Sequence, residues 1–130
     1  MKRYVTSGEG LPQWPSPISH AVVVNGTCYL SGQLSLDADG RYLPGTPADE
    51  ARRAFDNLFR ALAAAGFERH DLVFVDIAFT DIGALPDVNA VYAELFDAQR
   101  RPARTVYQAA ALPFGGQVKV MGVAVRDTAP

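Results

Sequence analysis

The amino-acid sequence predicts an α+β fold, a single domain with a mixed β-sheet and two helices packed on one face. The chain has 130 residues, a length that fits one domain. Apolar runs of strand length alternate with two stretches in which apolar residues recur at helical spacing. The predicted order over residues 1–130 is β-β-(β)-α-β-α-β-β, which is typical of one sheet with helices on one side.

The first third of the chain predicts an irregular arm followed by a hairpin. Glycines and prolines interrupt residues 1–17 and indicate an irregular N-terminal arm. Residues 21–31 predict a β-hairpin, because Asn25-Gly26 supplies the positive φ angles of a type I′ turn. Residues 33–36 are an optional third strand that ends at the turn sequence of residues 37–40.

Residues 46–66 carry the signals of an amphipathic helix. Thr46 suits the N-cap, Pro47 the first helical position and Gly66 the left-handed position after the last turn. Apolar residues recur at helical spacing between these ends: Ala51, Ala54, Phe55, Leu58, Leu62 and Ala65.

The second half predicts a strand, a helix and two more strands. Residues 71–80 are rich in β-branched and aromatic side chains, which favours a buried strand. A second apolar stripe begins near Pro86-Asp87 and fades before Pro102, which predicts the second helix. Its core-facing members are Val88, Val91, Tyr92, Leu95 and Phe96. The final strands are expected at residues 104–112 and 117–125, on either side of a turn at residues 113–116.

Composition excludes several classes of function. The net charge is −2 and the cations are scattered, so a nucleic-acid partner is not expected. No apolar stretch approaches the roughly 18–20 residues that cross a bilayer, and no signal sequence is evident, so we expect no membrane association and a cytoplasmic location. Cys28 is the only cysteine, which excludes an intrachain disulfide. His20 and His70 lie too far apart in sequence to indicate a metal site.

The predicted helices leave one face of the sheet uncovered. The hairpin and the two last strands are strongly apolar, so this face needs a cover. Further copies of the same chain supply one most simply, and a closed cyclic oligomer is therefore expected.

Several short motifs are specific when their order and spacing are taken together. They are Ser31-Gly32-Gln33, Asn57-Leu58, Ala64-Ala65-Gly66, Val88-Asn89-Ala90-Val91-Tyr92, Pro102-Ala103-Arg104-Thr105, Leu112-Pro113 and Val123-Ala124-Val125. On these motifs the chain resembles the RidA (YjgF-type) family of reactive imine and enamine deaminases. The resemblance implies a chorismate-mutase-like homotrimer with sites between subunits. It also implies hydrolysis of a 2-imino or 2-enamino acid to a 2-oxo acid and ammonia, without cofactor or metal.

By the same resemblance, Arg104 anchors the carboxylate of the substrate. A guanidinium binds a carboxylate through two parallel charge-assisted hydrogen bonds, a geometry that lysine cannot offer. Because imines already hydrolyse spontaneously, orienting the substrate contributes directly to catalysis. The resemblance implies that further residues line the cleft: Ser31, Gly32, Asn89, Pro113 and Phe114.

Three positions depart from the family's pattern. Ile18 occupies a position where the family usually has an aromatic residue, and Val106 one where it usually has a cysteine. Met121 occupies the position of a last-strand glutamate that is thought to handle water in the family. These residues should line the pocket, and their apolar character favours a bulkier or more hydrophobic imine than 2-aminoacrylate. A thioether cannot exchange protons, so the general base would be a backbone carbonyl, an ordered water or a side chain such as Gln108 or His20.

Two functional hypotheses follow from the sequence. The chain is a deaminase, or it is a non-catalytic protein of the same fold in which Arg104 binds a carboxylate metabolite as a sensor or regulator; Met121 favours the second. An endoribonuclease fits poorly with a pI of 5.6 and no basic stripe. Ser31-Gly32 is explained equally well by a strand-ending bulge. Cys28 lies in an apolar strand, where a cysteine is a small buried apolar side chain, and we assign it no chemistry.

Overall fold

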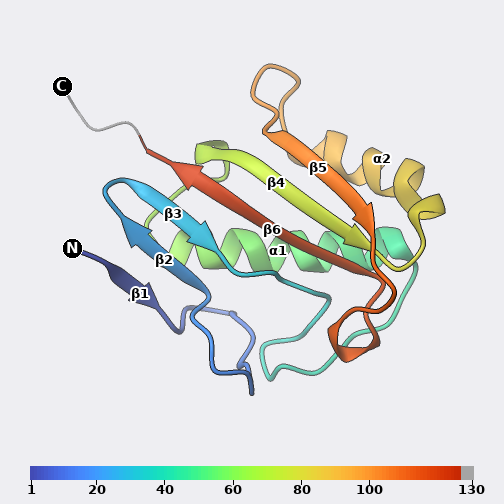
Figure 1. Ribbon diagram of the computed structural model, residues 1–130, viewed down its shortest axis with the longest axis horizontal. Helices are drawn as coiled ribbons and strands as arrows, with labels where there is room; N and C mark the ends of the chain where they lie inside the picture. Colours follow the sequence, from blue (N-terminus) through green and yellow to red (C-terminus); the bar gives the residue numbers. More distant parts are fainter. Residues whose placement is uncertain (127–130) are drawn as a thin grey trace.

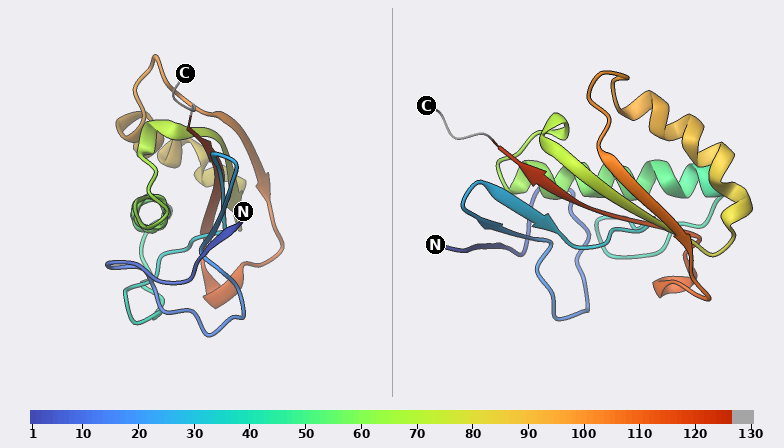
Figure 2. Two further views of the ribbon diagram at one scale, coloured as in Figure 1. Left: turned by 90° about the vertical axis from the view of Figure 1, so that its left-hand side faces the viewer. Right: turned by 45° about the horizontal axis from the view of Figure 1, so that its top comes forward.

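A computed structural model describes residues 1–126 of the chain. One six-stranded sheet has the order β1-β2-β3-β6-β4-β5, in which only β4 and β5 are parallel (Figure 1). The elements are β1 (Arg3–Val5), β2 (Ala21–Val24), β3 (Thr27–Leu30), α1 (Pro47–Ala64), β4 (Leu72–Phe79), α2 (Leu85–Leu95), β5 (Ala103–Gln108) and β6 (Val118–Val125). Both helices lie on the same side of the sheet (Figure 2), so the predicted α+β class is confirmed.

The β2–β3 hairpin forms as predicted. Asn25 has a φ of 49° and Gly26 a φ of 78°, the left-handed values that a type I′ turn requires. Ala21 pairs with Leu30, and the register continues to the residues beside the turn. The local Asn-Gly signal was therefore sufficient to set this pairing.

Helix α1 begins and ends at its predicted capping residues. The Thr46 hydroxyl accepts from the backbone N–H of Asp49, and the Asp49 carboxylate accepts in return from the N–H of Thr46. At the other end Gly66 has a φ of 84°, and its N–H donates to the carbonyl of Ala63. This arrangement satisfies the orphan carbonyls of the last turn.

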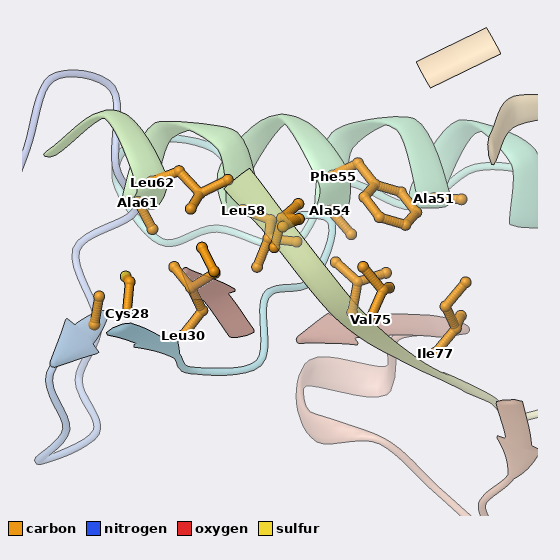
Figure 3. Close-up of a cluster of buried hydrophobic side chains, with 14 of the residues drawn as sticks. Cys28, Leu30, Ala51, Ala54, Phe55, Leu58, Ala61, Leu62, Val75 and Ile77 are labelled. Atoms are coloured by element: carbon orange, nitrogen blue, oxygen red, sulfur yellow. The ribbon is translucent and has the colours of Figure 1, made fainter. Parts of the chain in front are cut away.

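The core lies between α1 and the sheet, and Figure 3 shows side chains of the helix pointing toward β3 and β4. The apolar stripe predicted from the sequence supplies the helical half of this core, with Phe55 and Leu58 fully buried. Cys28 is also fully buried there, and burial raises the pKa of its thiol to about 11. The thiol is therefore a packing group and takes no part in the candidate site.

One prediction about the N-terminal third is wrong. The arm of residues 1–17 is not wholly irregular, because Arg3–Val5 forms β1 and pairs antiparallel with β2. This short segment precedes the glycines and prolines, so its backbone N–H groups are free to join the edge of the sheet.

Residues 33–36 make only two isolated bridges, Gln33 with Val120 and Leu36 with Tyr42, and do not form a third strand. The Asn57 side chain on α1 donates to the carbonyls of both Leu34 and Leu36 at 3.0 Å. A helix side chain therefore takes the place of a partner strand.

The later elements are the helix and strands that the sequence predicts, but their boundaries differ from the predicted ones. Strand β5 ends at Gln108, four residues before the predicted end, and α2 begins at Leu85. No helix within the described residues is long and apolar enough to cross a membrane. The single-domain prediction extended to residues 127–130, which lie outside the described part.

The alternation of side chains along the strands gives the sheet two chemically different faces. The helix face carries fully buried side chains such as Val75, Ile77 and Val120. The opposite side, which we call the open face, carries Lys119 and Met121 of β6, between the buried positions of that strand. Several exposed or partly exposed residues share the open face: Tyr29, Asp76, Thr105, Tyr107 and Val123.

Candidate functional site

Arg104 is held on the helix face by two residues of α2. It lies beside Val75 in the β4–β5 register, and β5 is the last strand of the sheet. Its guanidinium carbon stands 4.8 Å from the centre of the Tyr92 ring, and its Nη1 donates to Asn89 Oδ1 at 2.9 Å. The structure thus brings together two of the predicted site residues, Arg104 and Asn89.

The Arg104 guanidinium borders an open pocket of about 460 Å³ between α2 and the start of β5. Asn89, Tyr92 and Arg101 line the same pocket. The bond to Asn89 uses one N–H group, and the described residues contain no carboxylate paired with this guanidinium. Enough donors stay available for a carboxylate to bind in the parallel, two-bond geometry.

Tyr92 is a site residue that the sequence assigned only to the core. Its ring packs edge-on against Phe55 and lies 4.6 Å from the Phe96 ring, so its orientation is fixed from behind. Burial raises the pKa of its hydroxyl. The available signal was the spacing from Asn89, because residues three apart share one side of a helix.

Ser31 and Gly32 form a β-bulge beside β6. Tyr29 pairs with Val123 and Gln33 with Val120, so the three residues 30–32 stand opposite the two residues 121 and 122. One extra residue on one strand is the definition of a bulge, and bulges turn side chains out of the regular alternation. The bulge interpretation is therefore correct for this segment, and it is compatible with a place in a binding site.

Ser31 ties the bulge to the segment that carries Ile18. Its hydroxyl donates to the carbonyl of Ser19 at 2.5 Å, and its backbone N–H donates to the carbonyl of His20. Ile18 itself is 46% exposed. Two more predicted site residues therefore lie close together, around the bulge and away from Arg104.

Lys119 belongs to this second group, although the sequence analysis did not select it. A Cβ built on Gly32 would lie only 2.9 Å from Lys119 Cδ, so the lysine stem runs directly over the glycine. Met121 follows two residues later on the same face of β6. The overlooked signal was a single lysine in the apolar run Val118-Lys119-Val120.

Pro113 and Phe114 form the exposed tip of the turn before β6. Phe114 has a φ of 64°, and its ring is 37% exposed. It meets the Trp14 ring edge-on, with centroids 5.9 Å apart. Trp14 in turn packs on His20, so this tip is joined to the arm and not to Arg104.

The two groups of predicted site residues lie on opposite faces of the sheet. Arg104 and Val106 share the helix face, where Val106 packs against the core. Met121 pairs with Asp76 and lies on the open face, with β4 between it and β5. The pocket that Arg104 lines is formed by residues of α2 and the start of β5, and Met121 is not among its lining residues.

Comparisons with known proteins agree with this arrangement of elements. The family model described as Endoribonuclease L-PSP matches residues 12–126. The chain is 40% identical over 125 residues to the cattle protein named 2-iminobutanoate/2-iminopropanoate deaminase, which covers 95% of this chain and 90% of that protein. The chain belongs to the RidA family.

Solved structures of the RidA family superpose closely on this chain. RidA from an Antarctic Psychrobacter species is 30% identical with a TM-score of 0.88, over 95% of this chain and 100% of that one. Escherichia coli TdcF with bound serine is 25% identical with a TM-score of 0.87, over 96% of this chain and 100% of that one. The fold is therefore that of the family over nearly the whole chain.

Both side chains predicted as replacement bases in this RidA-family protein are already engaged. His20 is buried, its Nε2 lies 2.9 Å from the Pro12 carbonyl and its Nδ1 lies 3.0 Å from Gln33 Nε2. Because a carbonyl only accepts, Nε2 carries the proton and Nδ1 accepts from the amide. Gln108 Oε1 accepts from the backbone N–H of Ile82 at 2.9 Å. Each group would have to break a bond to activate water.

The described residues contain no group of three metal-ligating side chains. The positively charged groups near the two parts of the RidA-family site are Arg101, Arg104 and Lys119. Such a site is suited to an anionic ligand. A guanidinium with free N–H groups at an open pocket, as Arg104 has, is suited to binding a carboxylate.

Proposed function

We propose that this protein is a RidA-type deaminase that hydrolyses a small carboxylate-bearing 2-imine or 2-enamine to a 2-oxo acid and ammonia. The observation that carries the proposal is Arg104, fixed by Asn89 and Tyr92 and facing an open pocket. A relative that is 40% identical is named as a deaminase of 2-iminobutanoate and 2-iminopropanoate. Both of those compounds carry the carboxylate that such an arginine binds.

In the proposed reaction, Arg104 holds the carboxylate and so fixes the neighbouring imine carbon. Water adds to that carbon, a proton moves to the nitrogen, and the carbon–nitrogen bond of the resulting carbinolamine breaks to release ammonia and the 2-oxo acid. No electrons are transferred, so the reaction needs no redox cofactor. Orientation of water and substrate lowers the barrier of a reaction that already proceeds in solution.

The complete cleft in this proposal lies between two copies of the chain in a homotrimer. One copy contributes Arg104, Asn89 and Val106. The other contributes the residues around the bulge and the adjacent tip: Ile18, Ser31, Gly32, Pro113, Phe114 and Met121. Two observations support it: the groups lie on opposite faces, and the open face exposes large apolar side chains such as Tyr29 at 53% and Tyr107 at 43%.

A non-catalytic carboxylate-binding protein of the same fold is the second candidate. It is favoured by the side chains around the predicted water site, because Met121 cannot exchange protons and both His20 and Gln108 are engaged. In this alternative Arg104 would bind a 2-oxo acid without turnover. A nucleic-acid substrate is not proposed for either candidate, because the net charge is −2. We propose a cytoplasmic location for either candidate.

The test generates several 2-imino acids in place with an amino-acid oxidase and follows their loss by semicarbazide trapping. We expect the protein to accelerate that loss and Arg104→Ala to reduce kcat/KM about a hundredfold, since two charge-assisted hydrogen bonds are lost. Arg104→Lys should restore only part of the activity. Arg41→Ala, which removes an exposed cation in the 37–41 turn, is the matched control and should match the wild type.

The outcomes separate the two candidates. No acceleration for any imine, together with 2-oxo acid binding that Arg104→Ala abolishes, would establish the non-catalytic protein. Acceleration that Arg104→Ala leaves unchanged would remove the proposed anchor. Light scattering tests the assembly separately, and a monomer at the assay concentration would contradict the cleft between subunits.

A further inference from the structure

Lys119 is the one lysine in the sheet. Lys2, near the N-terminus, is the only other lysine in the chain. Lys119 lies on the open face of β6, between the buried residues Val118 and Val120. A cation in the middle of an apolar strand costs free energy when the surface around it is covered, unless an anion pairs with it.

The stem of Lys119 is fixed over the bulge. Three of its carbons, Cγ, Cδ and Cε, lie within 3.4 Å of the point where a Cβ would stand on Gly32. Any larger residue at position 32 would displace the stem. Gly32 is one of the residues proposed to line the cleft, so the stem of Lys119 runs beside that cleft.

The described residues offer Lys119 no ion pair. The open-face carboxylate on the neighbouring strand is Asp76, which pairs in register with Met121 and is therefore diagonal to Lys119. Asp76 instead accepts a hydrogen bond from the Thr105 hydroxyl on its other side. The stem of Lys119 runs toward Gly32 and away from Asp76. Its charge therefore has no ion-pair partner among the described residues.

We infer that Lys119 binds a second carboxylate of the substrate and that the preferred substrates are dicarboxylic 2-imino acids. This inference rests on the proposed deaminase and its cleft between copies, in which Arg104 of one chain faces Gly32 and Lys119 of the next. Arg104 then binds the carboxylate beside the imine carbon, and Lys119 binds the one at the far end. The apolar side chains Ile18 and Met121 contact the methylene groups between them.

A dicarboxylic substrate accounts both for the apolar side chains Ile18 and Met121 and for the unpaired cation Lys119 in the part of the site around the bulge. An entirely apolar imine would fit the walls but would leave the Lys119 ammonium unpaired in a covered interface. A dicarboxylic imine pairs both cations and still buries its methylene groups. The expectation of a bulkier substrate is thereby sharpened to a substrate that is longer and ends in an anion.

The catalytic test compares imines that differ in the terminal group alone. Glutamate and glutamine give 2-imino acids of the same length, one ending in a carboxylate and the other in a neutral amide. We expect the wild type to prefer the glutamate-derived imine at least tenfold in kcat/KM. Lys119→Met, which keeps the stem and removes the charge, should lower kcat/KM for the glutamate-derived imine at least tenfold and so abolish that preference. Lys119→Arg should keep the preference.

A binding test covers the case in which no imine is turned over. Calorimetry with 2-oxoglutarate and 2-oxopentanoate, which differ by the terminal carboxylate, should show at least tenfold tighter binding of the dicarboxylate by the wild type. That difference should vanish in Lys119→Met and persist in Lys2→Met, which removes the other lysine charge. Equal affinities in the wild type, or a preference that survives Lys119→Met, would overturn the inference and leave the deaminase proposal intact.

A structural role for Lys119 predicts a different result. If the ammonium paired with a carboxylate of a second copy, Lys119→Met would change the oligomeric state seen by light scattering and lower the melting temperature, with equal effects on both ligands. Such a result would overturn the inference. Loss of discrimination in an intact assembly would support it.

Discussion

The guanidinium of Arg104 rests on the ring of Tyr92, with 4.8 Å between the guanidinium carbon and the ring centre. The ring is itself fixed between Phe55 and Phe96, at centroid distances of 5.8 and 4.6 Å. The arginine is therefore orientated by the core before a substrate arrives. Less side-chain entropy is lost on binding, which is the general benefit of a pre-organised site.

The aromatic ring of Tyr92, and not its hydroxyl, should be needed for this positioning. The hydroxyl is buried without a hydrogen-bond partner among the described residues, so Tyr92→Phe should leave the melting temperature and KM close to those of the wild type. Tyr92→Leu removes the stacking surface and should raise KM about three- to tenfold with a smaller effect on kcat. Steady-state kinetics check this, and equal KM values for both variants would contradict it.

Asn89 should act through the orientation of Arg104. Its Oδ1 accepts from the guanidinium at 2.9 Å, so Asn89→Ala frees the arginine to turn and should raise KM about fivefold. Asn89→Asp places a carboxylate against the guanidinium and should inhibit far more, because it competes with the substrate for the same charge. Calorimetric titration of each variant with the 2-oxo acid product checks whether affinity falls from the wild type to Asn89→Ala and further to Asn89→Asp. Tighter binding by Asn89→Asp than by Asn89→Ala would contradict the prediction.

His20 should make the protein less stable in mild acid. Burial lowers the pKa of this imidazole below 6.5, so the unfolded chain binds a proton at a pH where the folded chain does not. Stability is therefore unaffected by this group above pH 6.5, and it declines as the pH falls from 6.5 toward the folded-state pKa. Urea unfolding at pH 7.5, 6.5 and 5.5 should show the decline.

Two variants separate the contribution of His20 to the pH dependence from that of carboxylates that titrate in a similar pH range. His20→Gln should have a shallower fall in unfolding free energy between pH 7.5 and 5.5 than the wild type. His70→Gln, which removes the exposed histidine beside Glu68 and Asp71, is the comparison variant. A wild-type slope in His20→Gln would assign the pH dependence to other groups.

Glu50 should be the most sensitive single position for stability. Its carboxylate is fully buried and accepts from the Tyr42 hydroxyl at 2.6 Å and from the backbone N–H of Gln117 at 3.0 Å. Glu50→Leu leaves these partly buried donors without their acceptor and should cost about 1–3 kcal/mol of unfolding free energy. Glu50→Gln keeps an acceptor for the backbone N–H and should cost distinctly less. Chemical denaturation of both variants checks the difference, and equal losses would contradict it.

The sequence was sufficient wherever a feature depends on neighbours along the chain. The Asn25-Gly26 turn needs only positive φ angles, and the ends of α1 need only Thr46 and Gly66. These features formed as predicted. Arg104 and Asn89 were selected by the family resemblance, and the structure places them in contact.

The remaining features depend on contacts between distant segments. The absence of a third strand follows from the Asn57 amide of α1, which occupies the carbonyls of Leu34 and Leu36. The position of Lys119 over Gly32 depends on the bulge between two strands 87 residues apart in numbering, and alternation within one strand cannot reveal it. Tyr92 was assigned to the core because it belongs to the apolar stripe of the second helix. Such a stripe does not show that part of a buried ring also contacts Arg104.

The placement of Arg104 and Gly32 on opposite faces has a genetic consequence. In the proposed assembly each chain contributes half of one cleft and half of the next, so a lesion in either half disables a cleft without disabling the chain. An Arg104→Ala chain mixed with a chain altered at Gly32 should regain activity, because some clefts then receive two intact halves. Two defective alleles would therefore complement each other, and activity would depend on how the chains are combined in each oligomer.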